Sequence, residues 1–425
     1  MKVVCGPSDT KVGAISKREL RVILYGFAEK SSQGSIGASM LTQIRRAKIV
    51  PAARAWDLLS LALSVIAADT AVRRDESPDG WTRQIDLKVA VSDAAFWNSQ
   101  ASLVQDQLRF LTTDIWSVEF VGNGLLPTPP KDEVNPPEKC VALLSGGLDS
   151  FVGVVDLVAA KNRPYVVSQV AMGDKRLQAS LASKIDGGLS HLQLNHNVSC
   201  PGENERSQRS RSLIFLAYGV IAATALKRYR NGKDVELYVC ENGFISINPP
   251  LTGSRLGSLS TRTTHPIFLA KVQALLDAAG LRVKIRNPYQ FKTKGEMLSS
   301  CKDQPLLIKH AAHTTSCGRY ARNGYEHCGR CLPCLIRRSA FHAWGKKDKT
   351  GYVYANLAKD DEKHARFDDV RCAAMAIAQV GSEGIDSLAR PNLNSVLMGD
   401  TAPYKELLKR GIAELERFLI SAGVK

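Results

Sequence analysis

The 425-residue sequence has no hydrophobic run of the length that a membrane-spanning helix requires. Its longest largely apolar run, Leu58–Ala68, lies between Asp57 and Asp69, and a span needs about 20 such residues. The first residues, Met1–Pro7, are too few to hold the apolar region of a secretory signal. We therefore expect a cytoplasmic protein without a membrane partner, in which the apolar run forms a buried helix.

Acidic residues are scarce relative to basic ones, with 41 Asp and Glu against 57 Lys and Arg and a net charge of +16. An excess of this kind attracts polyanions without selecting one. The basic clusters are short and scattered, with little aromatic interleaving, which argues against a nucleic-acid partner. They are Arg45-Arg46-Lys48, Lys227-Arg228-Tyr229-Arg230-Lys233, Arg337-Arg338 and Lys346-Lys347-Lys349.

The length predicts two or three domains with ample core. Residues 1–125 have the pattern of an α/β accessory domain, and a Pro-rich linker at 126–138 follows. Strands are expected at 22–25 and 116–121, a helix at 56–72, and a half-exposed antiparallel strand where apolar residues alternate over 85–91. No cluster of reactive residues occurs here, so the domain is either a scaffold or a docking surface for a protein.

The C-terminal residues 346–425 have the pattern of a helical extension. Helical periodicity covers 368–379 and 405–419, and Arg390-Pro391-Asn392 predicts a break between the two helices. We expect this extension to serve packing or oligomer contacts, with no active-site residue.

The central domain, 139–345, opens with the most informative stretch of the chain. An apolar run at 140–144 is followed by Ser145-Gly146-Gly147-Leu148-Asp149-Ser150 and then by an apolar helix pattern. A buried strand, a glycine turn and a helix N-terminus together form a cradle for an anion. The run lacks the G-K-[ST] of a Walker A loop, so the expected anion is a nucleotide pyrophosphate. An ordinary strand-to-helix turn is the alternative.

Ten cysteines without an export signal indicate a reducing compartment, where dense cysteines mark metal sites more often than disulfides. Four of them have the spacing C-x10-C-x2-C-x2-C, which predicts a closed structural zinc site. An iron–sulfur cluster and unmetallated thiols are the alternatives, since C-x2-C-x2-C also opens the bacterial ferredoxin motif. The four are Cys317, Cys328, Cys331 and Cys334, with His313 and His327 as spare potential ligands.

The S-G-G-L-D-S run resembles the loop of PP-loop ATP pyrophosphatases, which cleave ATP between the α and β phosphates. Together with the cysteine loop, it makes the stretch from Cys140 to Ala340 similar to the 7-cyano-7-deazaguanine synthases. Further segments carry the resemblance in the family's order. They are Arg211-Ser212-Leu213-Ile214-Phe215-Leu216, Val239-Cys240-Glu241-Asn242-Gly243, Asn287-Pro288-Tyr289, Lys294-Gly295-Glu296 and Cys328-Gly329-Arg330-Cys331-Leu332-Pro333-Cys334.

The resemblance implies an α/β fold with a doubly wound parallel sheet of the adenine nucleotide α-hydrolase type and a zinc loop. It implies activation of 7-carboxy-7-deazaguanine by ATP with Mg²⁺, with Ser145 to Ser150 at the ATP and Asp149 near Mg²⁺ or ATP. By family position, Arg211 and Lys294 are expected to clamp phosphates or the carboxylate. Glu241 or Glu296 either holds the amino edge of the deazaguanine or faces solvent.

The chain also departs from that family. Residues before about 135 and after the zinc helix are additional, and the segment from Phe244 to Arg255 differs. This longer architecture is similar to the synthase-like component of Qat antiphage cassettes. We therefore hypothesise that the enzyme joins the deazaguanine carboxylate to an amine of a partner protein. Nitrile synthesis for queuosine, a tRNA-directed PP-loop ligase and an ATP-binding sensor without turnover are the alternatives.

Overall fold

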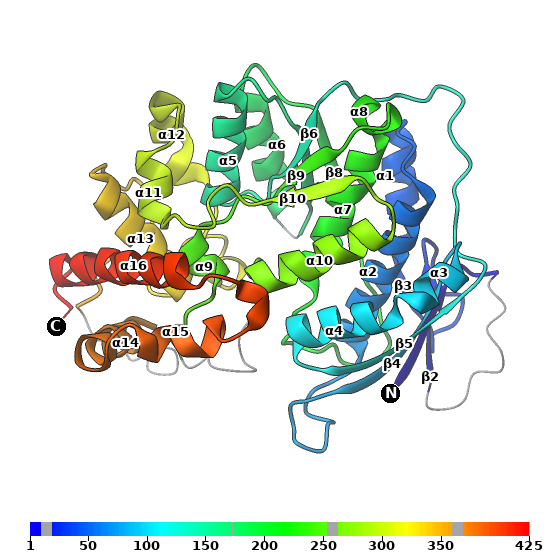
Figure 1. Ribbon diagram of the computed structural model, residues 1–425, viewed down its shortest axis with the longest axis horizontal. Coiled ribbons are helices and arrows are strands. Elements are labelled where there is room, and N and C mark those ends of the chain that lie inside the picture. Colours follow the sequence, from blue (N-terminus) through cyan, green and yellow to red (C-terminus); the bar gives the residue numbers. More distant parts are fainter. Residues whose placement is uncertain (10–18, 172, 253–261, 359–368, 425) are drawn as a thin grey trace.

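Two parallel five-stranded sheets and their helices form most of the molecule (Figure 1). The computed structural model describes residues 1–9, 19–171, 173–252, 262–358 and 369–424. Sheet A has the order β3-β2-β1-β4-β5, and sheet B has the order β10-β9-β6-β7-β8. The expected α/β fold is confirmed. Sheet A comprises β1 (Lys2–Gly6), β2 (Glu19–Leu24), β3 (Gly34–Ile36), β4 (Gln84–Ala90) and β5 (Ile115–Val121). Sheet B comprises β6 (Cys140–Leu143), β7 (Tyr165–Gln169), β8 (His191–Leu194), β9 (Val235–Tyr238) and β10 (Val283–Arg286).

Sheet B is buried on both faces. Val141 and Leu143 of β6 belong to the core shared with α7, whereas Ala142 belongs to the core that contains Phe151 of α5. Because the chain winds first from β6 to β8 and then returns to β9 and β10, the strand order reverses between β6 and β9. Ligands of open α/β sheets bind at the carboxyl ends of strands at such a reversal. The helices of this part are α5 (Leu148–Ala159), α6 (Asp174–Lys184), α7 (Arg211–Ala225), α8 (Lys227–Arg230), α9 (Gly243–Ser246) and α10 (Pro266–Ala278).

Sheet A corrects one expectation from the sequence. The alternation over 85–91 is present, but β4 pairs in parallel with both β1 and β5, so the antiparallel assignment was wrong. Exposed and buried residues alternate along β4 and β5, because the described helices cover one face of this part of the sheet. A parallel strand thereby takes the half-exposed pattern that is more common in antiparallel sheets. The helices are α1 (Met40–Arg46), α2 (Ala53–Ala71), α3 (Ala94–Ser99) and α4 (Ala101–Thr112).

The two sheets share one hydrophobic core, because α2 packs against α7 and α4 packs against α10 between them. The carboxylate of Asp69, near the end of α2, accepts hydrogen bonds from the backbone N–H groups of Arg209 (2.7 Å) and Ser210 (2.9 Å), just before α7. The same Asp69 pairs with Arg83, whose guanidinium also reaches Asp114. The N-terminal unit is therefore joined to sheet B by apolar packing and by a buried ionic network.

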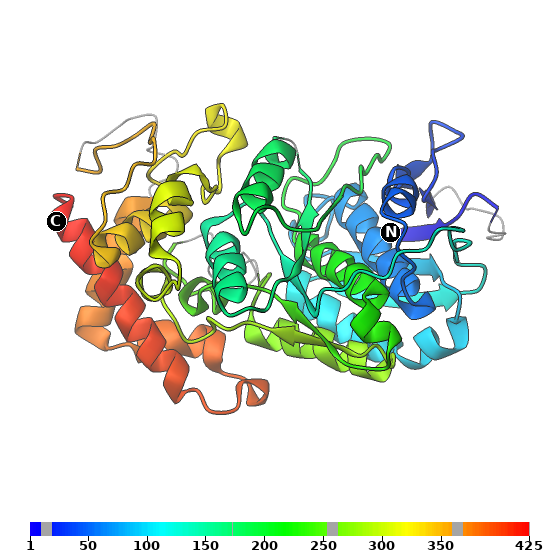
Figure 2. The ribbon, with the colours of Figure 1, turned by 90° about the horizontal axis from the view of Figure 1, so that it is seen from above.

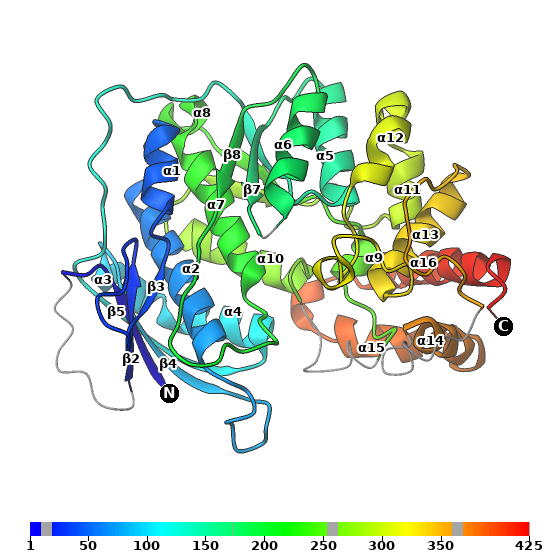
Figure 3. The same ribbon diagram turned by 180° about the vertical axis from the view of Figure 1, so that it is seen from behind.

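The remaining helices cover the end of sheet B that is far from sheet A (Figures 2 and 3). They are α11 (Lys294–Ser299), α12 (Gln304–His310), α13 (Leu332–Trp344), α14 (Asp369–Glu383), α15 (Asp386–Leu393) and α16 (Ala402–Ser421), with short 3-10 turns η3 (Ala311–His313), η4 (Ala321–Asn323) and η6 (Val396–Met398). The break expected at Arg390-Pro391-Asn392 was misplaced, because α15 continues to Leu393. Within the described residues, no helix is long and apolar enough to cross a membrane.

Candidate functional site

The glycine loop after β6 has the strand–turn–helix context that the sequence predicts. Gly147 is the N-terminal cap residue of α5, and no side chain caps the first turn. Gly146 has φ +89°, a conformation that favours glycine. Ser145 Oγ accepts a hydrogen bond from Gly147 N (3.2 Å) and lies 3.0 Å from Ser150 Oγ. The loop is thus folded back on itself, with the N-terminus of α5 facing outward.

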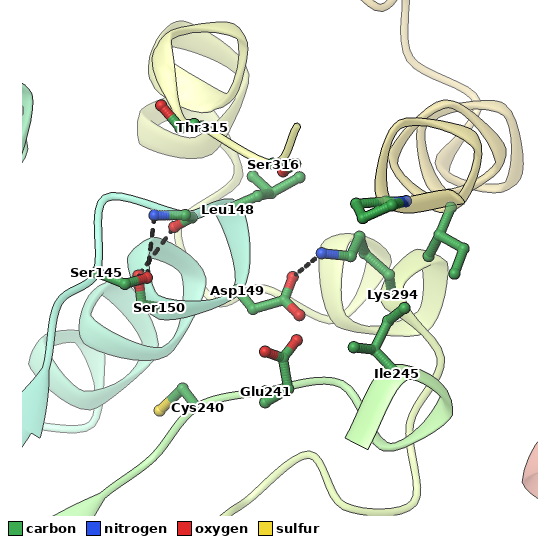
Figure 4. Close-up of a pocket in the computed structure, with 13 residues that line it drawn as sticks. Ser145, Leu148, Asp149, Ser150, Cys240, Glu241, Ile245, Lys294, Thr315 and Ser316 are labelled. Carbon is green, nitrogen blue, oxygen red and sulfur yellow. Dashed lines mark hydrogen bonds and ion pairs between the residues drawn. The ribbon is translucent and has the colours of Figure 1, made fainter. Parts of the chain in front are cut away.

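A cavity of about 260 Å³ lies over this helix N-terminus (Figure 4). Gly147, Leu148, Asp149 and Ser150 line one side, and Thr315 and Ser316 line another. Backbone N–H groups and the positive end of a helix dipole favour an anion at this point. The geometry therefore suits a phosphate or pyrophosphate group.

The carboxylate of Asp149 is the centre of a buried network in this cavity (Figure 4). Lys294 Nζ lies 2.6 Å from its Oδ1, while the side-chain and backbone nitrogens of Asn242 donate to Oδ2 at 2.6 and 3.1 Å. Burial opposes ionisation of Asp149, but the Lys294 ammonium and the hydrogen bonds of Glu241, Lys294 and Asn242 lower its pKa below the ordinary value. An ionised Asp149 therefore holds Lys294 in place.

Glu241 presents a second carboxylate to the same cavity from the loop that follows β9. Asn242 Nδ2 bridges the two acids, since it donates to Glu241 Oε1 at 3.1 Å and to Asp149 at 2.6 Å. Asn287 holds the Glu241 backbone, donating from its amide to the carbonyl oxygen at 2.9 Å. Asn242 was missed as a site residue. It also caps α9, accepting from Ile245 N, and an Asn before a short apolar helix signals that role.

A second cavity, of about 310 Å³, adjoins the first and shares Ser145, Ser150, Cys240 and Glu241 with it. Arg211, at the start of α7, lines only this second cavity, whereas Lys294 lines only the first. The two predicted clamps therefore serve different chambers. Burial raises the pKa of Asp174, which also lines the second chamber, although the Arg211 charge opposes this shift.

Glu296 does not line either of these chambers. Its Oε2 accepts from Thr293 N (2.9 Å) while Thr293 Oγ1 accepts from Glu296 N (3.1 Å), which is a capping box at the start of α11. Its Oε1 pairs with Arg410 of α16 at 2.7 Å. Of the two predicted acidic residues, only Glu241 reaches the cavity.

The four predicted cysteines come together as one buried group. Their sulfur atoms all lie within 4.8 Å of one another, with Cys317–Cys331 at 3.8 Å and Cys328–Cys334 at 3.9 Å. Zn–S bonds of about 2.3 Å give a tetrahedron with edges of about 3.8 Å, so the geometry fits zinc. Cys328 N donates to Cys317 Sγ, and Cys331 N donates to Cys328 Sγ, which favours thiolates. Among the described residues, no histidine joins the group.

His327 has a structural role instead. Its Nε2 accepts a hydrogen bond from Ser316 N at 3.1 Å, and its ring packs edge-on against Tyr320 and Tyr352. Burial lowers its pKa to about 4, so that the ring is neutral at pH 7 and can accept that bond.

The metal loop forms one wall of the first cavity. Thr315 N donates to Gly146 O at 2.9 Å, and Pro333 and Ile336 line the cavity near the cysteines. Arg337 is fully buried and donates to Ser316 Oγ and Thr314 Oγ1, each at 3.0 Å. Arg337 therefore fixes the metal loop. It belongs to one of the basic clusters of the sequence, but because it is buried it cannot contact nucleic acid. A folded metal loop thus shapes the first cavity.

Comparison with known proteins bears on part of the chain. The family model described as "Queuosine biosynthesis protein QueC" matches residues 264–345. The 7-cyano-7-deazaguanine synthase of Rhizobium etli is 27% identical over 247 residues, which cover 50% of this chain and 92% of the relative. That of Methanococcus maripaludis is 24% identical over 244 residues, covering 51% and 99%. No solved structure is significantly similar to the chain.

These matches confirm the resemblance to the 7-cyano-7-deazaguanine synthases that the motifs indicate. The relatives are covered almost completely by about half of this chain. The other half has no counterpart in them.

Proposed function

We propose that the cleft activates the carboxylate of a 7-deazaguanine with ATP and joins the activated acyl group to an amine. The observation that carries this is the uncapped N-terminus of α5 facing a cavity that also holds the Asp149–Lys294 pair. The similarity to enzymes named 7-cyano-7-deazaguanine synthase supports the choice of a deazaguanine.

The chemistry requires two displacements. A carboxylate oxygen of the substrate attacks the α-phosphorus of ATP, and pyrophosphate leaves. The amine nitrogen then attacks the acyl carbon, AMP leaves, and the amine loses a proton. The N–H groups of Leu148, Asp149 and Ser150 lie where they can stabilise the charge that develops on pyrophosphate. Mg²⁺ enters with ATP as its counter-ion.

Each remaining site residue has a role in this scheme. Lys294, held by Asp149, supplies positive charge in the first chamber, and Arg211 supplies it in the second. Glu241 accepts hydrogen bonds from the N–H groups at the amino edge of the base, from its place between the two chambers. Zinc on the four cysteines is a structural staple that holds the cavity wall.

For the acceptor, we propose an amine of a partner protein from an antiphage cassette. The half of the chain without a counterpart in the relatives supports this, because an added unit can dock a macromolecule. An α-amino group, with a pKa near 7.7–8.0, is better supplied as the free amine at neutral pH than Lys at about 10.4. With ammonia in its place, the first product would be the primary amide, and its dehydration with a second ATP would give the nitrile for queuosine.

The test is a reaction of the full chain with ATP, Mg²⁺ and 7-carboxy-7-deazaguanine. We expect AMP and pyrophosphate, with pyrophosphate release dependent on the deazaguanine. ADP and orthophosphate would exclude the PP-loop chemistry, and ATP binding without turnover would favour a sensor. Dependence of turnover on tRNA would favour the RNA-directed ligase.

The acceptor is decided by the product. Intact-mass analysis of a co-encoded partner protein should show the mass of the deazaguanine acyl group. Free 7-cyano-7-deazaguanine formed with ammonia, and no change in mass of the partner, would favour the nitrile synthase.

A further inference from the structure

The C-terminal helix α16 (Ala402–Ser421) packs on the wall of the candidate site, although it lies outside the matched segment 264–345. It contacts α13, which follows the metal loop, and α9, which follows Glu241 and Asn242. Figure 1 shows it lying across this end of the molecule. Its buried face is apolar except at Glu414, which is only 6% exposed.

The carboxylate of Glu414 holds the start of α11. Its Oε2 accepts from Thr293 Oγ1 at 2.6 Å, and its Oε1 accepts from Gly295 N at 3.2 Å. Thr293 is the cap residue of α11 and Lys294 is its first residue. The flanking residues of Lys294 are thus both bound by one side chain from α16. A carboxylate at a helix N-terminus is also favourable to the helix dipole.

The same helix holds the start of α9. A Cβ added at Gly411 would lie 2.3 Å from the ring of Phe244, and one added at Gly243 would lie 2.6 Å from a methyl group of Leu407. These close approaches leave α9 little freedom to move against α16. Asn242, immediately before α9, donates to Asp149 from both its backbone and its side chain.

We infer that α16 completes the active site from outside it, and that Glu414 is a positioning residue that acts through Lys294. Two partners of the Asp149 carboxylate, Lys294 and Asn242, stand at the starts of helices that α16 contacts. The inference rests on the proposed function, because Lys294 matters to turnover only if the first chamber holds ATP. Small displacements of a positioned group cost rate, with losses of up to about 100-fold for 1 Å.

The test compares Glu414→Gln with Glu416→Gln, which makes the same charge change on the exposed side of α16. Thr293 and Gly295 bind different oxygens of Glu414, and glutamine replaces one of these oxygens with an NH2 group, which cannot accept a hydrogen bond. We expect the kcat for deazaguanine-dependent pyrophosphate release to fall about tenfold in Glu414→Gln, with the KM for ATP changed much less. Glu416→Gln should match the wild type.

A double-mutant cycle with Lys294→Arg separates positioning from a general structural role. If Glu414 acts through Lys294, Glu414→Gln should cost far less kcat in the Lys294→Arg background. Full additivity, or an unchanged kcat in the single variant, would overturn the inference. If Glu414→Gln does not fold, Gly411→Ala probes the other contact of α16, with Phe244 of α9. This variant should also lower kcat.

Amide hydrogen exchange gives a readout that needs no turnover. In Glu414→Gln, the amides of 294–298 should exchange faster than in Glu416→Gln, while those of sheet A should not change. Equal exchange in the two variants contradicts the clamp. If the two variants differ in this way but the wild-type chain releases no pyrophosphate, the clamp stands and the proposed function is refuted.

Discussion

Sheets A and B have the same strand order, yet among the residues that the structure describes the cavity with the Asp149–Lys294 pair lies at sheet B. Counted along the chain within each sheet, both run 3-2-1-4-5 with all strands parallel. In each, the helix between the third and fourth strands and the helix between the fourth and fifth strands face the other sheet, so that α2 meets α7 and α4 meets α10.

The site of sheet B lies at its first connection. In sheet B, α5 follows the first strand and turns its uncapped N-terminus toward the cavity. In sheet A, no described residue between β1 and β3 is helical. In sheet B, the helix that follows the first strand provides the anion site, and the charged side chains gather around that helix.

The most direct test of this difference removes one buried acid near the carboxyl ends of the strands of each sheet. Asp149→Asn should lower kcat for pyrophosphate release by about 10²–10³, because Lys294 loses its counter-charge and its position. Asp57 of α2 accepts from Ser92 N (2.7 Å) and Trp97 Nε1 (3.0 Å) beyond β4. Asp57→Asn should cost about 1–3 kcal/mol of stability and leave kcat per folded molecule unchanged. Equal losses of kcat would contradict the assignment of the site to sheet B.

The sheet B half of the molecule should depend on the metal loop for its structure, whereas the sheet A half should not. Elemental analysis should find one zinc per chain, and Cys334→Ser should abolish zinc binding and disorder the wall formed by Thr315 and Ser316. Cys5→Ser, in the core of sheet A, is the matched control and should keep full zinc content. Iron with a visible absorption band would exclude the zinc assignment.

The sequence predicted the features that depend on residues close together along the chain. The glycine loop and the cysteine group form as their short-range spacing predicts, and Glu241, expected from the family resemblance, lines the cavity. The contacts that join distant segments were missed. Neither the shared core of α2 and α7 nor the grip of Glu414 on α11 follows from local pattern. A signal for Glu414 was present, since a charged residue between Gly411 and Leu415 interrupts the apolar stripe of α16.

The buried ionic network between the two sheets should contribute to the stability of the whole chain. Asp69→Ala removes the acceptor for Arg209 N and Ser210 N and leaves Arg83 with one partner fewer. We expect a loss of about 3 kcal/mol, because breaking a buried charge network leaves unpaired groups. Urea unfolding should measure it. Asp75→Ala, at an exposed ion pair, should change stability by less than about 1 kcal/mol. If Asp69→Ala leaves stability unchanged, the ionic network does not hold the two sheets together, and the apolar packing of α2 on α7 alone joins them.

The smallest expected effect is that of pH. Acid should destabilise sheet B before sheet A. All 8 histidines follow residue 125, and burial lowers the pKa of His191 and of His196 to about 4, with the charge of Arg211 adding to the shift at His196. The unfolded chain binds these protons at about pH 6.5, so stability is full above that pH and is lost as pH falls toward 4. His191 Nε2 lies 2.8 Å from Ser168 Oγ. Glutamine at this position does not titrate but can still bond that hydroxyl, so His191→Gln should flatten the dependence of the unfolding free energy on pH between about 6.5 and 4. An unchanged slope would mean that the folded protein protonates His191 as readily as the unfolded chain does.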